Sequence, residues 1–179
     1  MSRLLPSSLA HHRGPLRSVA LVLHALDTLA GWAIIGMLGV MVTVVSLQVV
    51  LRYALSSSIG FADEMSRLTF VWSIFLGIPL GIRLGAHIGM ELLSSRLPPR
   101  MQNMLARALA AGAAAMMVLV AWQSAVVAFD QWDELMASMH ASAAWFIVAV
   151  SVGCAHAALH LAWIALTGKP TMAAATSTE

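Results

Sequence analysis

Apolar positions dominate four long stretches of the chain, and these stretches contain no Asp, Glu, Lys or Arg. The charge-free runs cover residues 28–51, 68–82, 108–129 and 135–168. A helix that crosses the hydrocarbon core of a bilayer needs about 20 apolar residues at about 1.5 Å per residue. The pattern therefore predicts an all-α membrane protein whose four transmembrane helices cover approximately residues 25–50, 67–84, 107–129 and 143–167.

The second and fourth runs differ in length from an ordinary span. The second is short, but Arg67 and Arg83 bound it, and long basic side chains can reach the headgroups from within the bilayer. A buried core helix or a re-entrant segment remains the alternative for a run of this length. The fourth run is too long, and Trp145 and Trp163 mark its edges, roughly 27 Å apart along a helix.

The distribution of basic residues predicts the orientation. Arg3, Arg13 and Arg17 precede the first apolar stretch, which is too long for the core of a cleaved signal peptide. An uncleaved first span with a cytoplasmic N-terminus places most of the ten Lys and Arg residues on the cytoplasmic side. We therefore expect a single membrane domain over residues 1–179 with both termini in the cytoplasm.

Composition agrees with a chain surrounded mainly by hydrocarbon. Apolar residues make up 60% of the sequence and charged residues 10%, with a mean hydropathy of +0.84. Soluble domains have roughly 45–50% apolar and about 25% charged residues. The basic residues are dispersed, so a nucleic-acid partner is not expected. The single cysteine, Cys154, cannot form a disulfide within the chain.

Small residues at four-residue spacing suggest where the helices pack. Transmembrane helices associate through close backbone contact, which small side chains permit. The second span carries such a row at Gly77, Gly81 and Gly85, and the fourth span carries a weaker one centred on Gly153. We expect these glycines to lie at helix contacts.

Two polar segments beside the second span resemble short amphipathic helices. Residues 58–67 combine apolar side chains with Asp63, Glu64 and Arg67, and residues 88–97 follow a similar pattern before two prolines. Amphipathic helices of this kind lie in the interface between membrane and water. We therefore expect interfacial helices after the first and second spans.

The chemistry that the sequence lacks is also informative. The charge-free runs hold no titratable carboxylate or amine, whereas such groups at membrane depth usually mark ion and proton paths. This argues against a self-sufficient ion-coupled transporter. No catalytic constellation or phosphate-binding loop is recognisable, so we expect no enzymatic activity, no catalytic residues, no metal site and no cofactor. A scaffold or an obligate subunit is the favoured class.

The seven histidines leave an alternative open, a haem-binding four-helix membrane cytochrome. His156 and His160 share a face of the fourth span, and His24 and His87 lie near the same side of the membrane in the predicted topology. Haem ligation needs two imidazoles that face each other across a cavity. A Soret band in the purified protein would favour this alternative.

Three sequence blocks resemble one known family. They are LQVVLRY at 47–53, DEMSRLTFVW at 63–72 and RLGAHI at 83–88. Their order, spacing and predicted sides of the membrane resemble the small membrane subunit, the DctQ type, of tripartite ATP-independent periplasmic (TRAP) transporters. The third and fourth spans carry no motif of this kind and are predicted from hydropathy alone.

The resemblance implies a role in a bacterial inner-membrane complex that takes up organic acids. In such a complex a periplasmic solute-binding protein captures the substrate, and a large permease subunit moves it by sodium-coupled symport. The small subunit supports the permease within the lipid bilayer, with docking of the binding protein as a further role. The positions that match the family, and are expected at a partner or membrane interface, are Arg52, Glu64, Arg67, Arg83 and His87. For Arg52 and Arg67, simple contact with lipid headgroups remains the alternative.

Overall fold

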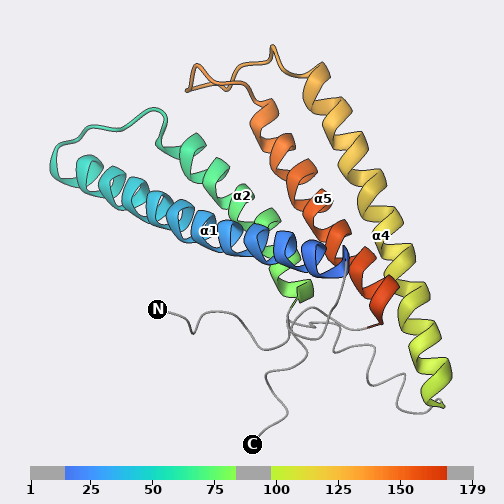
Figure 1. The fold of residues 1–179 in the computed structure, drawn as a ribbon. Helices are drawn as coiled ribbons and strands as arrows, with labels where there is room; N and C mark the ends of the chain where they lie inside the picture. Colours follow the sequence, from blue (N-terminus) through green and yellow to red (C-terminus); the bar gives the residue numbers. More distant parts are fainter. Residues whose placement is uncertain (1–14, 84–97, 169–179) are drawn as a thin grey trace, which may run out of the picture.

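The computed structural model describes residues 15–83 and 98–168, which form helices joined by two short connections (Figure 1). The helices are α1 (Pro15–Ala54), α2 (Ala62–Arg83), α4 (Pro99–Asp130) and α5 (Ala144–Thr167). Each is long and apolar enough to cross a membrane. The prediction of an all-helical chain with four spanning helices is confirmed, and the only β pairing in the described residues is an isolated bridge between Leu135 and Ser142.

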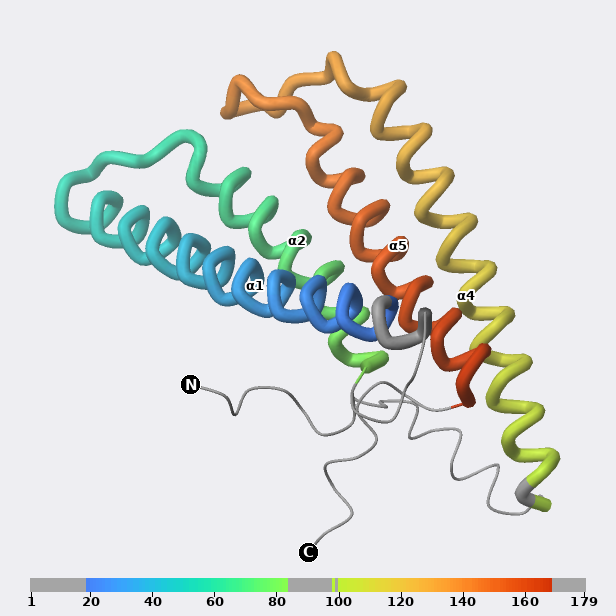
Figure 2. The backbone as a smooth tube through the Cα atoms, in the orientation of Figure 1, coloured from blue at the N-terminus to red at the C-terminus, as the bar shows by residue number. Residues whose placement is uncertain are grey.

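The helices of the described residues stand in a row rather than in a closed bundle. Helix α1 packs on α2, α2 packs on α5, and α5 packs on α4. The two connections, residues 55–61 and 131–143, lie at the same end of this row (Figure 2). We call this end the loop end. The opposite end holds the N-terminal part of α1, the C-terminal end of α2 and the C-terminal end of α5.

Helix α5 is the central element and α1 is the peripheral one. Half of the most apolar segment of α5 is buried within the chain, whereas none of the corresponding segment of α1 is. Figure 1 shows α1 running obliquely across the row. Its N-terminal part contacts α5 through a small apolar cluster of Ala20, Leu23 and Trp163. With 40 residues, α1 is about 60 Å long, twice the hydrocarbon thickness, so it must tilt strongly or extend beyond the bilayer.

The closest helix contact joins α5 to α2 at a glycine. A Cβ atom added to Gly153 would lie 2.5 Å from the carbonyl oxygen of Phe75, too close for any side chain. Added Cβ atoms at Gly77 and Gly81 would meet no atom within 4 Å. Gly153 therefore permits the packing of α5 on α2, whereas Gly77 and Gly81 face open space among the described residues. Gly85 lies outside the described residues.

The polar segment after the first span forms part of α2 rather than a separate helix. Helix α2 begins at Ala62 and continues without a break to Arg83, so Asp63 and Glu64 occupy its first turn. Carboxylates are favoured there because they interact with the positive end of the helix dipole. The expected separate interfacial helix is therefore not found at 58–67. The second expected interfacial helix, 88–97, includes residues outside the described part of the chain.

Candidate functional site

Three helices bring four polar side chains together at the end of the row opposite the loop end. We call these residues, Asp27, Arg83, His156 and His160, the polar cluster. Asp27 comes from α1, Arg83 is the last residue of α2, and the two histidines lie one turn apart on α5. Asp27 is 3% exposed and His160 is 1% exposed, so the cluster is almost closed to solvent.

The carboxylate of Asp27 is the hub of the cluster. Its Oδ1 atom lies 3.1 Å from Nε2 of His156 and 2.8 Å from Nε2 of His160. Its Oδ2 atom accepts a hydrogen bond of 3.2 Å from Nη1 of Arg83. Because an ionised carboxylate can only accept, both imidazoles donate from Nε2–H in this arrangement. One side chain from α1 thereby binds α2 and α5 together.

Charge pairing makes this burial tolerable. With neutral imidazoles, the negative charge of Asp27 balances the positive charge of Arg83, and a buried charge without a partner would cost several kcal/mol. In the described residues, no buried side-chain nitrogen or oxygen lacks a hydrogen-bond partner. The cluster is therefore an ion pair in which the buried polar atoms are hydrogen-bonded. Substitution of one of its members would leave buried polar atoms without a partner, so we expect these positions to tolerate few side chains.

The cluster corrects one expectation from the sequence. The first charge-free run begins at Thr28, one residue after Asp27, and the spans were therefore expected to hold no titratable group. In the structure, the part of α1 that is apolar enough to span a membrane runs over Val19–Ala54, and Asp27 is buried within it. The expectation is wrong for α1. Two signals pointed to the site: a lone carboxylate inside an apolar helix, and His156 and His160 four residues apart on a facing helix.

The histidine pair does not form a haem site. The two rings belong to neighbouring turns of one helix, and their centroids are 5.2 Å apart. Two ligands of a haem iron must approach from opposite faces of the macrocycle, so His156 and His160 cannot form an axial pair. Of the other two histidines considered, His24 is exposed with its Nδ1 atom 3.3 Å from Oγ1 of Thr28, and His87 lies outside the described residues.

A second polar contact joins α2 to the 131–143 connection at the loop end. A carboxylate oxygen of Glu64 accepts hydrogen bonds from the backbone N–H of Ser138 at 3.0 Å and from its hydroxyl at 2.7 Å. Nearby, the indole Nε1 of Trp72 donates to the carbonyl oxygen of Trp145 at 3.1 Å. The contact of Glu64 joins the connection to the N-terminal turn of α2, and the contact of Trp72 joins α2 to the first turn of α5. Of the family-matched residues, Glu64 is therefore engaged within the chain.

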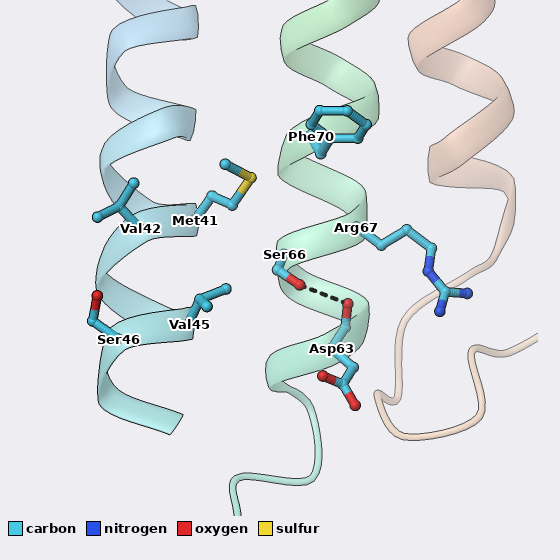
Figure 3. A pocket seen from close by; sticks show the side chains of 8 residues that line it. All are labelled: Met41, Val42, Val45, Ser46, Asp63, Ser66, Arg67 and Phe70. Atoms are coloured by element: carbon cyan, nitrogen blue, oxygen red, sulfur yellow. Dashed lines mark hydrogen bonds between the residues drawn. The ribbon is translucent and has the colours of Figure 1, made fainter. Parts of the chain in front are cut away.

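The remaining family-matched residues differ in their surroundings. Arg52 and Arg67 are exposed, and His87 lies outside the described residues. Arg67 belongs to the rim of a groove between α1 and α2, with a volume of about 510 Å³. Figure 3 shows its guanidinium extending on the side of α2 that faces away from α1. The lining residues are Met41, Val42, Val45, Ser46, Asp63, Ser66, Arg67 and Phe70. Arg83 is the one family-matched residue in the polar cluster.

Comparison with known protein families gives one match. The model of the family described as "Tripartite ATP-independent periplasmic transporters, DctQ component" matches residues 41–168. This range begins within α1 and ends one residue after α5, so it contains most of the described helices. Asp27 lies before the matched range, and the other three members of the polar cluster lie within it. Comparison with curated proteins finds no match.

Proposed function

Since this chain belongs to the DctQ family of tripartite ATP-independent periplasmic transporter components, we propose that it is the stationary support of a larger permease subunit. The family assignment itself makes the chain a membrane component of a transporter. The proposal adds that the complex takes up organic acids in symport with sodium, and that this chain also helps to dock the periplasmic solute-binding protein. Both termini are proposed to lie in the cytoplasm of a bacterial cell, with the helices in the inner membrane.

The observation that supports a supporting role is the open row of helices. In a closed four-helix bundle the first and last helices also pack together, whereas the substantial contacts here are α1 with α2, α2 with α5 and α5 with α4. A row does not enclose a passage between its own helices. A solute path through the membrane therefore requires walls from another protein, which agrees with a subunit that braces a permease.

Exposed apolar side chains indicate a large surface for lipid and for a partner. In α1 they include Leu29, Trp32 and Ile35, and α4 exposes Met116 and Trp122. Several of these residues are more than half exposed within the chain, which suits a hydrocarbon or protein environment but not water. We propose that the permease covers part of this surface and that lipid covers the rest.

Glycines with open space around them in the described part of the chain, and exposed arginines, are proposed contacts of this assembly. Gly77 and Gly81 leave open space where a helix of the permease could approach closely. Gly85 and His87 are assigned to the same role from the family pattern alone. Arg52 and Arg67 are proposed to bind either the permease or lipid headgroups at the loop end.

Deletion of the gene for this chain tests the proposed function. We expect uptake of the transported organic acid by cells to be lost, while the purified periplasmic protein binds its ligand as before. Expression of this chain from a plasmid should restore uptake, and the large subunit should co-purify with it. Uptake at the normal rate in liposomes that contain the permease without this chain would contradict the supporting role.

A further inference from the structure

The polar cluster has a ligand arrangement that its role as an ion pair does not require. We propose that Asp27, His156 and His160 form a binding site for one divalent transition-metal ion, with zinc as the best chemical match. This inference concerns α1 and α5 of this chain and is independent of the proposed function. It differs from the sequence-based expectation, which included no metal site.

The donor set is the first argument for a metal ion. Two imidazole nitrogens and one carboxylate oxygen are ligands that Zn²⁺ commonly uses. His156 and His160 are four residues apart on one helix face, the spacing at which two histidines on a helix bind the same zinc ion in metalloproteases. The third donor comes from another helix, so that binding would join α1 to α5. All three donor atoms lie within 4.8 Å of one another.

The distances are the second argument. Oδ1 of Asp27 is 3.1 Å from one imidazole nitrogen and 2.8 Å from the other. Donor atoms of a tetrahedral zinc site, with bonds of about 2.1 Å, stand about 3.4 Å apart. If the two distances between Oδ1 and the imidazole nitrogens increased by a few tenths of an ångström, a zinc ion would therefore fit between the three donor atoms. Each imidazole would move its proton from Nε2 to Nδ1, since a metal binds the free lone pair.

The surroundings of the donors are the third argument. Arg83 binds Oδ2 and leaves Oδ1 directed at the imidazoles, so one carboxylate oxygen remains available to a metal ion. The side chain of Arg83 is 16% exposed at the end of α2, so the cluster reaches the protein surface at this residue although Asp27 is buried. The fourth ligand would be water or hydroxide, as in zinc sites with three protein ligands.

The positive charge of Arg83 repels a bound cation. The proposal therefore predicts in which direction the metal affinity changes when this charge is removed. Like charges that are a few ångströms apart repel strongly in a medium of low dielectric constant. A negative fourth ligand, such as hydroxide, reduces the repulsion. Replacement of the guanidinium by a neutral amide should therefore tighten metal binding, by roughly tenfold or more. A cluster that only pairs charges has no such dependence.

The test uses variants that keep the hydrogen bonds but lose the metal ligands. The double variant His156→Gln and His160→Gln retains a side-chain N–H donor toward Asp27 at both positions, while an amide is a poor zinc ligand. The full-length chain is purified in detergent, treated with a chelator, and dialysed against buffered zinc. Metal content is then measured by mass spectrometry, and zinc affinity by competition with a chromophoric chelator.

We expect wild-type protein to bind one more zinc ion per chain than the double variant. The variant His140→Gln, which changes an exposed histidine in the 131–143 connection, should bind as much as wild type. The affinity of this site should fall by more than about 100-fold in the double variant, since even partners outside the ligand set change affinity roughly 10- to 100-fold. Arg83→Gln should bind zinc more tightly than wild type.

Equal zinc content in wild type and the double variant, with equal helix content by circular dichroism, would overturn the proposal. Cobalt provides a second measurement that does not depend on the folding of any variant. Co²⁺ added to metal-free wild-type protein should give the intense visible absorption of a tetrahedral nitrogen and oxygen site. A spectrum that remains that of aqueous Co²⁺ would show that the polar cluster is an ion pair alone.

Discussion

The two ends of the helix row are held together by different means. At the end that holds the polar cluster, which we call the cluster end, the buried carboxylate of Asp27 on α1 contacts side chains of both α2 and α5. At the loop end, α1 and α2 border an open groove (Figure 3). A carboxylate oxygen of Glu64 there accepts a hydrogen bond from Ser138 in the connection between α4 and α5. The cluster end therefore fixes where α1 meets its neighbours, whereas at the loop end α1 is joined to α2 by an exposed hydrogen bond, from Gln48 to Asp63.

This difference has an energetic meaning. A charge in a buried pair has lost its hydration, so removal of its partner leaves it uncompensated and costs about 3–5 kcal/mol. An exposed polar contact exchanges its bonds for water at little cost. Equivalent substitutions at the two ends should therefore have very different effects.

The largest effect is expected for Asp27→Asn at the cluster end. The variant keeps the shape of the side chain but removes the negative charge that pairs with the guanidinium of Arg83. We expect a loss of about 3 kcal/mol of folding free energy, at the lower end of the range because Arg83 is partly exposed. Thermal or denaturant unfolding in detergent provides the measurement.

Asp63→Asn is the matched control for that substitution. Asp63 is an exposed carboxylate at the loop end, where its Oδ1 atom accepts a hydrogen bond of 3.3 Å from Gln48. We expect a change within about 0.5 kcal/mol. Equal losses in the two variants would show that the polar cluster is no more important for stability than a surface contact.

The second effect concerns the contact between α5 and α2. Gly153→Ala places a methyl group against the backbone of Phe75, which cannot move without displacing α2. We expect a loss of about 1–3 kcal/mol. Gly81→Ala is the control, because its Cβ meets no atom and alanine favours a helix by up to about 1 kcal/mol over glycine. A stabilising effect of Gly153→Ala would contradict the close contact seen here.

The third effect should be visible only in the assembled transporter. Gly81→Leu adds a bulky side chain in open space, so the isolated chain should melt close to the wild-type temperature. If the permease packs on this face, the amount of large subunit that co-purifies should fall several-fold. Unchanged co-purification would remove the glycine row from the interface and leave the arginines and the apolar faces of α1 and α4 as candidates.

The sequence predicted the helices better than it predicted their contacts. Apolar runs of sufficient length define spanning helices because the bilayer leaves the backbone no alternative, and all four expected spans are found as helices. Residues 47–53, 63–72 and 83–88 also indicated the family that the comparison shows. Spans and motifs are continuous stretches of residues, so they can be identified from one sequence without knowledge of how the helices pack.

The polar cluster could not be predicted with the same ease. Asp27 lies just outside a charge-free run, and its partners follow it by more than fifty residues along the chain. Which faces of α1, α2 and α5 meet depends on tertiary packing, and hydropathy contains no information on it. The same limit explains Gly153 and Gly81, which are equally small but lie in a tight contact and in open space respectively.

The smallest effect is expected for Glu64→Gln at the loop end. The amide retains one acceptor oxygen for the hydroxyl and N–H of Ser138 but loses the negative charge that strengthens both bonds. Because this contact is exposed to solvent, the melting temperature should hardly change, and the 131–143 connection should become more accessible to a protease. Limited proteolysis from the loop end measures this change, with Asp130→Asn as a control that removes an exposed carboxylate at the end of α4. Cleavage at the wild-type rate in Glu64→Gln would mean that the connection is held without help from Glu64, through the ring contacts of Trp132 with Trp145 and of Trp145 with Trp72. The two ends would then differ in that a buried ion pair stabilises the cluster end, whereas packing of tryptophan rings stabilises the loop end.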